Sequence, residues 1–335
     1  MADLLQSLVR GAEPVERPVW ADFWERLHER RLKNGEALAV LASLSTRTPV
    51  TPTLESFLGS LTDRAAPLPA RWPGVVNLVG TGGGPATFNL TTAAVLVAAA
   101  TGVPIVKTGS RGYSSRYGSI DILDRVGLPT ARSYAECEDL LGRFGLAFAS
   151  GFVYPVELTE LARAVLPYGM QQIGRFVNLL GPFLAAVPVE VQLTGVSSPE
   201  LWDGFAELAA DRRVWLIRND LGVDELLSFT GNTVRANGTE LAVGPGTVGA
   251  AGGTLADLRP AAEGTDAAEH LLDLLRGHGP AAAVESICLN AAAAAIAAGR
   301  TTDWAEAFAT ARAAVADGAA VGLVERLRRE VRAGV

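Results

Sequence analysis

The chain has 335 residues, of which 49% are hydrophobic and 19% charged, so it is a globular protein with an ample core and not a disordered one. Its formal net charge of −7 excludes a broad basic surface for nucleic acid, and any bound phosphate must therefore be held by local geometry. This length exceeds that of one average domain and accommodates a large α/β unit with a small appendage.

Cysteine and histidine are scarce. Cys137 and Cys288 are too few and too isolated for a disulfide framework or a thiolate metal site, and the three histidines show no metal-binding spacing. Residues 1–17 carry charges throughout and lack the apolar segment of a signal peptide. No apolar run reaches the roughly eighteen residues of a membrane span. We therefore expect a cytoplasmic protein that binds neither nucleic acid nor membrane.

The first 65 residues have helical spacing and no strand pattern. A first helix is predicted to open at Leu4, and three more are predicted over residues 20–32, 36–44 and 53–61. Pro49 and Pro52 break the pattern before the last of these. A small helical module followed by a linker at residues 65–73 is therefore expected.

Residues 75–79 form an apolar, β-branched run that predicts a short buried strand. A glycine-rich loop follows, and then a small-residue helix over residues 93–100 with polar caps; the residues concerned are Gly80, Thr81, Gly82, Gly83, Gly84, Asn89, Thr91 and Thr92. A strand, a glycine loop and a helix N-terminus in that order form a phosphate site, because free amides and the helix dipole favour negative charge. An ordinary strand-to-helix turn has the same pattern, and neither a Walker loop nor a full dinucleotide fingerprint is present.

A second strand and loop repeat this arrangement. Residues 104–106 predict a short strand, and the loop over residues 107–119 is dense in hydroxyls and cations. Lys107 stands at the strand end, where open α/β sheets place ligand contacts. Ser119 is predicted to cap a helix that begins at Ile120. Two such loops on adjacent strands indicate a ligand with two phosphate groups, although each cation taken alone fits a solvated surface.

Short apolar runs then alternate with helical stretches. Strands are predicted over residues 146–148, 189–194 and 214–217, and helices over residues 137–143, 158–166 and 202–210. This alternation predicts a largely parallel sheet covered by helices. Residues 267–335 are mainly helical, and the alanine-rich stretch 291–298 indicates close helix packing.

Asp224 and Glu225 are adjacent acids that follow the strand at 214–217 and a turn at 219–222. Two carboxylates can hold Mg²⁺, which takes a few oxygens from protein and the rest from water and phosphate. A solvated loop is the alternative.

Three stretches together carry a resemblance: GTGG with TFNLTTAA, GVPIVKTGSR, and SSRYGSIDILDRVG. They resemble the site for phosphoribosyl diphosphate (PRPP) of the anthranilate phosphoribosyltransferase family and, more distantly, the pyrimidine nucleoside phosphorylases. The resemblance continues through NLLGP at 178–182, GVDEL at 222–226 and CLNAAAA at 288–294, and so spans nearly the whole chain. It implies a helical domain at residues 1–68 that carries a homodimer contact. It also implies an α/β PRPP-binding catalytic domain at residues 69–335, with a mainly parallel central sheet flanked by helices.

The implied reaction transfers the 5-phosphoribosyl group of PRPP to an aromatic acceptor with release of diphosphate, and it depends on Mg²⁺. The resemblance implies Mg²⁺ binding by Asp224 and Glu225, with the Thr91 hydroxyl as a further ligand. No residue is assigned as a general acid or base. The implied PRPP-binding residues are Gly80, Thr81, Gly82, Gly83, Asn89, Thr91, Thr92, Lys107 and Ser119.

The chain departs from the family pattern at several positions. Gly84 stands where the family's GTGGD motif has Asp, and the loop from there to Asn89 is one residue shorter than in the family. Thr108 and Ser110 replace the His and Asn of Lys-His-Gly-Asn-Arg, which face the acceptor. The family's arginine that meets anthranilate's carboxylate corresponds to a position near Tyr168 in this chain. The family's His before proline is replaced here by Tyr154.

The acceptor half is therefore less well matched than the donor half. The residues expected at the acceptor are Thr108, Ser110, Arg111, Tyr154, Tyr168 and Pro182. A different aromatic acceptor, including one of secondary metabolism, stays open. Two other functions also stay open. One is a nucleoside phosphorylase, which Arg111-Gly112 slightly favours, although Ser114-Ser115 and Gly118-Ser119 favour the transferase. The other is a non-catalytic paralogue.

Overall fold

The computed structural model describes residues 4–11, 13–111, 118–262 and 264–333. Ser114 and Ser115, which favour a transferase in the sequence, lie outside the described residues. The chain divides into two compact units, which we name the helical unit and the α/β unit. The helical unit comprises Met1–Leu68, Val153–Val187 and Asp203–Leu208; the α/β unit comprises Pro69–Phe152, Pro188–Trp202 and Ala209–Val335.

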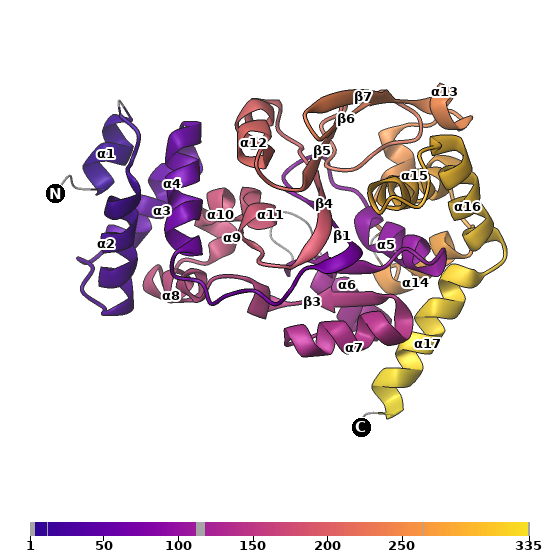
Figure 1. Cartoon of the computed structure of the whole chain (residues 1–335), viewed down its shortest axis with the longest axis horizontal. Helices are drawn as coiled ribbons and strands as arrows, with labels where there is room; N and C mark the ends of the chain where they lie inside the picture. The colour runs from indigo at the N-terminus through magenta and orange to yellow at the C-terminus, as the bar shows by residue number, and fades with distance from the viewer. Residues whose placement is uncertain (1–3, 12, 112–117, 263, 334–335) are drawn as a thin grey trace. The chain divides into compact units, whose positions relative to one another are not determined.

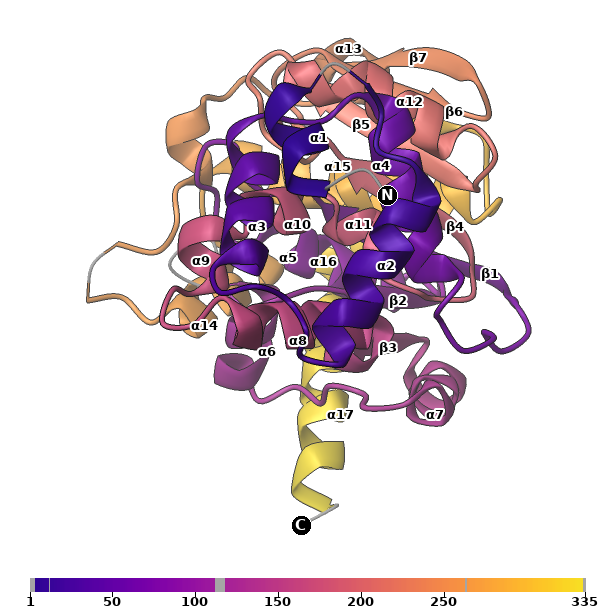
Figure 2. The same cartoon turned by 90° about the vertical axis from the view of Figure 1, so that its left-hand side faces the viewer.

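Eight helices lie wholly within the described part of the helical unit (Figure 2). They are α1 (Leu4–Arg10), α2 (Arg17–His28), α3 (Glu36–Thr46), α4 (Thr51–Thr62), α8 (Val156–Ala164), α9 (Met170–Ile173), α10 (Arg175–Leu179) and α11 (Gly181–Leu184). The helix α12 (Trp202–Ala209) belongs to this unit for most of its length.

The boundaries of two predicted helices differ from the sequence expectation. The helix α2 ends at His28 and not at residue 32, because Arg30 adopts a left-handed backbone with φ of 56°. The helix α4 begins at Thr51 and includes Pro52 in its first turn. Proline is tolerated there because its missing N–H would have no partner within the helix.

Aromatic side chains fill the core of the helical unit. Trp20, Phe23 and Trp24 lie on one face of α2 at helical spacing and are fully buried. Phe57 of α4 meets the Trp20 and Trp24 rings edge-on at centroid distances of 5.0 and 5.6 Å, and its ring lies 5.1 Å from that of Phe176. Hydrophobic burial therefore joins α2 and α4 to the later helix α10.

This packing changes the expected domain division of 1–68 and 69–335. Residues 153–187 and 203–208 belong with the N-terminal helices and not with the sheet. The reason is tertiary, since the apolar faces of α8 and α10 are buried against α2 and α3. Position along the chain does not reveal this choice.

The α/β unit contains a seven-stranded sheet in the order β3-β2-β1-β4-β5-β6-β7 (Figure 1). The strands are β1 (Trp72–Gly80), β2 (Ile105–Thr108), β3 (Leu146–Ala149), β4 (Val189–Gly195), β5 (Val214–Asn219), β6 (Asn232–Ala236) and β7 (Thr239–Val243). The first five are parallel, as predicted. The antiparallel hairpin β6–β7 was not predicted, although its Asn237-Gly238 turn, with both φ positive, is a hairpin signal.

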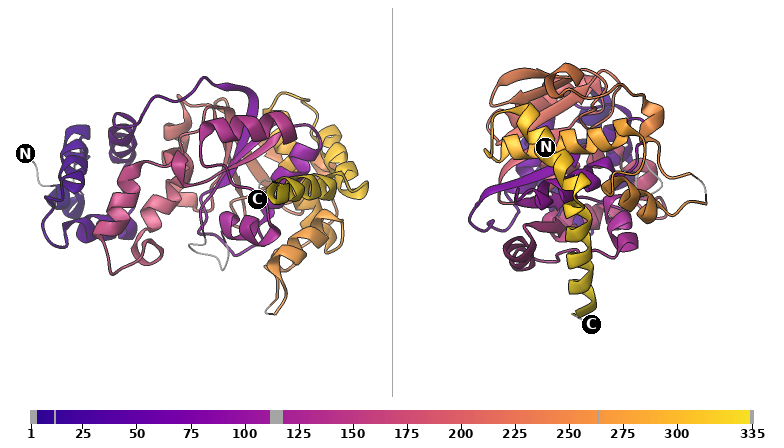
Figure 3. Two further views of the ribbon diagram at one scale, coloured as in Figure 1. Left: turned by 90° about the horizontal axis from the view of Figure 1, so that it is seen from below. Right: turned by 90° about the vertical axis from the view of Figure 1, so that its right-hand side faces the viewer.

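Helices of the same unit flank the sheet. They are α5 (Leu90–Ala100), α6 (Ser119–Val126), α7 (Tyr134–Phe144), α13 (Pro245–Val248), α14 (Ala267–Leu275), α15 (Ala281–Ala297), α16 (Trp304–Ala316) and α17 (Ala319–Ala333). Helix α15 packs closely on α5, and its small side chains at 291–294 are buried, which confirms the packing predicted for this alanine-rich stretch. Figure 3 shows α17 extending away from the sheet.

Within the described ranges, no single helix is both long and apolar enough to cross a membrane. The helices α16 and α17 reach the required length and composition only as a pair, and the pair is bent by 60°.

Candidate active site

The predicted phosphate-binding segments follow the carboxyl ends of parallel strands. Gly80 ends β1, Thr108 ends β2, Gly195 ends β4 and Asn219 ends β5. Because these strands are parallel neighbours, their ends share one edge of the sheet, where open α/β sheets bind ligands. The glycine loop (residues 80–84) and the acidic loop (residues 219–225) therefore meet at this edge.

A direct hydrogen bond joins the two loops. The backbone N–H of Gly82 donates to Asp224 Oδ2 at 2.7 Å. Gly82 and Gly83 have φ of 68° and 85°, a backbone region that favours glycine. A Cβ atom on Gly80 would overlap the Asp224 carboxylate, and one on Gly195 would overlap the Asp224 carbonyl. The missing side chains therefore let the acidic loop lie directly against both strand ends.

Glu225 lies beside this contact and is 7% exposed. The Thr91 hydroxyl of α5 donates to its Oε1 atom at 3.0 Å. Its Oε2 atom is buried and has no hydrogen-bond partner in the described structure. Burial, followed by the charge of Asp224, raises the pKa of Glu225 to about 8. Burial also raises the pKa of Asp224.

These carboxylates fit a divalent cation. A buried carboxylate oxygen without a partner costs free energy, and a cation removes that cost by coordination and charge. The described residues contain no group of three or more histidine, cysteine or acidic side chains able to surround a metal. Two carboxylates and a threonine hydroxyl instead suit Mg²⁺, which keeps several waters and binds substrate phosphates.

Lys107 lies within β2 and not in the loop that follows it, which corrects the predicted strand end. Its side chain is 5% exposed, and Nζ donates to the Leu78 carbonyl at 3.2 Å. Burial lowers the pKa of Lys107 to about 8, while the charges of Glu225 and Asp224 oppose this shift. The site therefore combines a buried cation with one buried and one half-buried acid, which is a composition typical of functional sites.

Two asparagines that the sequence reading did not assign hold the acidic segment in place. Asn219 Nδ2 donates to the carbonyls of Val223 and Glu225, at 2.8 and 2.7 Å. Asn290 of α15 accepts from the Leu226 N–H and donates to the Leu226 carbonyl. The available sequence signal for Asn290 was an asparagine directly before the alanine-rich stretch, and the structure shows that it is fully buried.

The remaining predicted donor residues lie at the start of α5 and α6. Thr92 is buried within α5, and Asn89 is its N-cap residue. Ser119 is the first residue of α6 and not its cap, because Gly118 holds the N-cap position and donates its N–H to Asp121. A Cβ atom on Gly109 would overlap the Ser119 hydroxyl, so the two segments lie in close contact.

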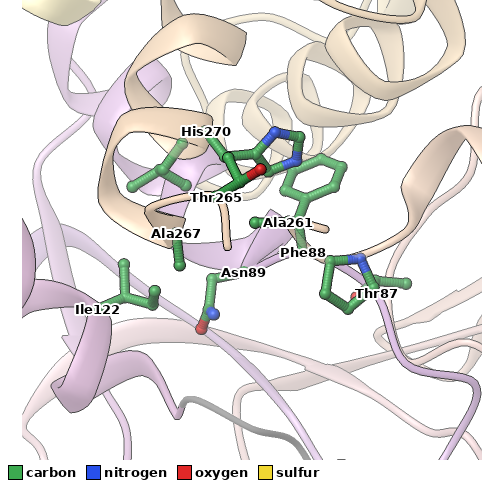
Figure 4. A pocket seen from close by; sticks show the side chains of 10 residues that line it. Thr87, Phe88, Asn89, Ile122, Ala261, Thr265, Ala267 and His270 are labelled. Carbon is green, nitrogen blue, oxygen red and sulfur yellow. The ribbon is translucent and has the colours of Figure 1, made fainter. Parts of the chain in front are cut away.

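Asn89 also lines a small cavity of the α/β unit (Figure 4). The cavity measures about 40 Å³ and includes Phe88, Ile122 and His270 in its wall. Burial lowers the pKa of His270, and no lysine or arginine is among the described residues of the lining. A neutral cavity with room for a few waters is not the predicted phosphate site.

Two predicted acceptor residues are already engaged within the α/β unit. Thr108 is fully buried, and its N–H and hydroxyl donate to Asn77 Oδ1 at 3.1 and 3.3 Å. Thr108 therefore has no free surface in this structure, and its contact with the acceptor stays a prediction. The Arg111 guanidinium pairs with Asp121 and Asp124 of α6 at 2.9 and 3.0 Å.

The other acceptor residues divide between the units. Ser110 follows β2, and its carbonyl accepts from the Ile120 N–H at 3.3 Å. Tyr154, Tyr168 and Pro182 belong to the helical unit, where Tyr168 is 48% exposed. A shared acceptor surface for these residues stays a prediction.

Comparison with known proteins is consistent with this geometry. Residues 73–321 match the family model described as "Glycosyl transferase family, a/b domain". The anthranilate phosphoribosyltransferase of Methylocella silvestris is 32% identical over 98% of this chain and 94% of its own length. The crystal structure of anthranilate phosphoribosyltransferase from Thermus thermophilus superposes with a TM-score of 0.81 at 28% identity, covering 99% of this chain and 100% of the other. The Saccharomyces cerevisiae enzyme, in complex with PRPP and Mg, has the same fold, with a TM-score of 0.75 at 20% identity over 95% and 92% of the two chains.

Proposed function

Because the chain belongs to the anthranilate phosphoribosyltransferase family of glycosyltransferases, we propose that it transfers the 5-phosphoribosyl group of PRPP to an aromatic acceptor and releases diphosphate. The observation that carries this proposal is the hydrogen bond from the Gly82 N–H to Asp224, which joins an anion-binding loop to a cation-binding pair. The related yeast structure is a complex with PRPP and Mg, which supports the same donor and metal here.

The proposed donor site uses three kinds of group. Amides of the glycine loop face the diphosphate, and Thr91 and Lys107 supply a hydroxyl and a cation near it. Asp224 and Glu225 hold Mg²⁺, which when bound neutralises charge on the leaving diphosphate. Since the sugar becomes positive as the diphosphate becomes negative, most of the catalysis comes from positioning and electrostatic stabilisation.

No general base is required in this proposal. The attacking nitrogen of an arylamine reacts with a sugar carbon whose bond to diphosphate is largely broken. The buried cation Lys107 and the amides of the glycine loop stabilise the departing group instead of moving a proton. The protein's task at the acceptor is therefore to orient the ring and to exclude water.

Calorimetric titration with PRPP in the presence of Mg²⁺ tests the donor assignment. The wild-type protein is expected to bind, and Asp224→Asn to weaken binding on the order of 100-fold, because a carboxylate ligand of the cation is lost. Asp220→Asn is the matched control, since this exposed acid lies in the same loop and loses the same charge. Absence of Mg²⁺-dependent PRPP binding by the wild type refutes the proposal.

The acceptor is a separate part of the proposal. Arg111 is retained from the family motif but is paired with Asp121 and Asp124, and Thr108, which replaces the family's His, is buried, so neither residue offers much to a carboxylate. We therefore propose an aromatic acceptor that includes, but is not restricted to, anthranilate. Diphosphate release should be followed with PRPP and a panel of aminobenzoates, hydroxybenzoates and pyridine carboxylates.

The same assay separates the alternatives. Phosphorolysis of pyrimidine nucleosides without PRPP turnover identifies a nucleoside phosphorylase. PRPP binding with no diphosphate release across the panel contradicts the proposed transfer. We also propose a homodimer in the cytoplasm, on the family resemblance, and light scattering of the purified full chain measures the oligomeric state directly.

A further inference from the structure

Ser197, which follows β4, makes a set of contacts to the glycine loop that the sequence reading did not assign. Its hydroxyl donates to the Gly82 carbonyl at 2.6 Å. Its N–H donates to Thr81 Oγ1 at 3.3 Å, and the two hydroxyls lie 3.4 Å apart. Ser197 is 9% exposed, so water competes little for these bonds.

This arrangement fixes the direction of one peptide group. In a trans peptide the carbonyl and the following N–H point to opposite sides. Because Ser197 holds the Gly82 carbonyl on its own side, the N–H of Gly83 is turned away from Ser197. Gly83 is exposed, and the neighbouring Gly82 N–H already faces Asp224. The loop therefore presents an amide to an incoming anion without reorganising.

Gly84 allows the loop to approach Ser197 this closely. A Cβ atom at position 84 would overlap the Gly222 carbonyl and would lie 3.0 Å from Ser197 Cβ. The overlapping group is backbone and cannot swing aside as a flexible side chain can. The glycine that replaces the family's aspartate is thus required by the packing of residue 84 between Ser197 and Gly222.

We propose that Ser197 is a positioning residue for the donor, which holds the glycine loop so that its amides receive the diphosphate of PRPP. This inference rests on the proposed function. Ser197 acts through the Gly82 peptide and touches no reacting atom. Gly84 contributes to the same arrangement, because a side chain at position 84 would push the glycine loop away from the acidic loop.

The test compares Ser197→Ala with Ser197→Cys, which retains the side-chain volume but hydrogen-bonds weakly. Both variants are expected to raise the Kd and the KM for PRPP about three- to tenfold, because one buried hydrogen bond is lost. The KM for the acceptor is expected to stay at its wild-type value, and the unfolding midpoint is expected to fall only slightly, because one buried hydrogen bond is lost. Ser198→Ala is the matched control, because that neighbouring hydroxyl donates to Glu200.

Three results overturn the inference. The first is wild-type PRPP affinity in Ser197→Ala, and the second is wild-type PRPP affinity in Ser197→Cys alone, which would show that side-chain volume and not the hydrogen bond matters. The third is an equal loss of PRPP affinity in Ser198→Ala. If the wild type itself binds no PRPP, the proposed function fails as well, so the two failures are distinguishable. Gly84→Asp restores the residue of the family pattern and is expected to weaken PRPP binding. Tighter binding by Gly84→Asp would contradict the packing argument.

Discussion

The aromatic core of the helical unit and the polar strand ends of the α/β unit both bury side chains, but the first buries apolar rings and the second buries ionisable groups. Trp20, Trp24 and Phe57 bury large apolar rings against one another, which stabilises the fold. Lys107 and Glu225 are also buried but are ionisable, and burial shifts the pKa of each in the direction that favours its neutral form.

The aromatic core therefore stabilises the fold, whereas the polar strand ends reduce its stability. Burying a charge without full compensation is costly, and the orphaned Oε2 of Glu225 is a case of it. Such a cost is retained where a bound cation and an anionic substrate remove it. Changes in the aromatic core should therefore reduce stability and spare binding, while changes at the strand ends should reduce binding and cost less stability.

The largest loss of stability is expected from Phe57→Ala. Removing this buried ring leaves a cavity beside Trp20 and Trp24, at a cost of about 3–5 kcal/mol. Denaturant unfolding followed by tryptophan fluorescence measures the loss, with Phe57→Leu as a milder control. PRPP affinity measured well below the unfolding midpoint should stay at the wild-type value, and a parallel loss of affinity would break the contrast between the two regions.

Gly195→Ala is the corresponding change at the strand ends. The added methyl overlaps the Asp224 backbone, so the acidic loop must move, with a stability loss of about 1–3 kcal/mol. Mg²⁺-dependent PRPP binding should fall by at least about tenfold, since a cation ligand is displaced. Gly246→Ala is the matched control, because nothing lies within 4 Å of a Cβ there. Normal PRPP binding by Gly195→Ala would show that the acidic loop tolerates displacement.

The pH dependence of stability sharpens the comparison further. The folded-state pKa of Glu225, about 8, exceeds its ordinary value of 4.5, so the folded protein retains a proton that the unfolded chain releases. Stability should therefore fall between about pH 4.5 and 8, on the order of 2–4 kcal/mol, and Glu225→Gln should flatten this limb. Lys107 acts oppositely between about pH 8 and its ordinary 10.5, where stability should rise with pH.

The ligand-free protein should accordingly show a stability minimum near pH 8, measurable by urea unfolding across pH. Lys107→Met should flatten the alkaline limb and, because the charge of Lys107 lowers the pKa of Glu225, should extend the falling limb to higher pH. Asp220→Asn, an exposed acid of the same loop, should leave the profile unchanged. A profile that is flat in the wild type would show that neither buried group titrates as described.

Arg111→Ala is expected to have the smallest effect on stability. Its guanidinium is exposed, and its ion pairs with Asp121 and Asp124 are screened by solvent. The unfolding midpoint should stay within experimental error of the wild type. The informative measurement is the KM for the aromatic acceptor, because an increase confined to carboxylate-bearing acceptors would identify Arg111 as their partner.

Much of the architecture followed from local pattern. The alternation of apolar runs and helical stretches predicted a parallel sheet with flanking helices, since buried strands and amphipathic helices have different periods. The glycine loop, the polar start of α5 and the adjacent acids also stand out locally. They predicted a phosphate site and a pair of metal ligands without any contact being known.

The hairpin β6–β7 was missed although Asn237-Gly238 is a recognisable turn, because its strands are short and β7 is largely exposed. Thr108, which the sequence assigned to the acceptor, directs its hydrogen bonds inward to Asn77, because a polar residue at a strand end can point either into the protein or toward a ligand. Sequence alone does not distinguish these two directions.

By itself, the sequence determined most of the secondary structure and the family, and it predicted the residues that bind phosphate and metal, because those properties depend on near neighbours in the chain. Only the tertiary structure decided that residues 153–187 pack with the N-terminal helices, that Asp224 lies against Gly82, and that Ser197 and Gly222 leave no room for a side chain at Gly84. These contacts join segments more than 80 residues apart, and their geometry follows from how buried surfaces fit together and not from any local preference.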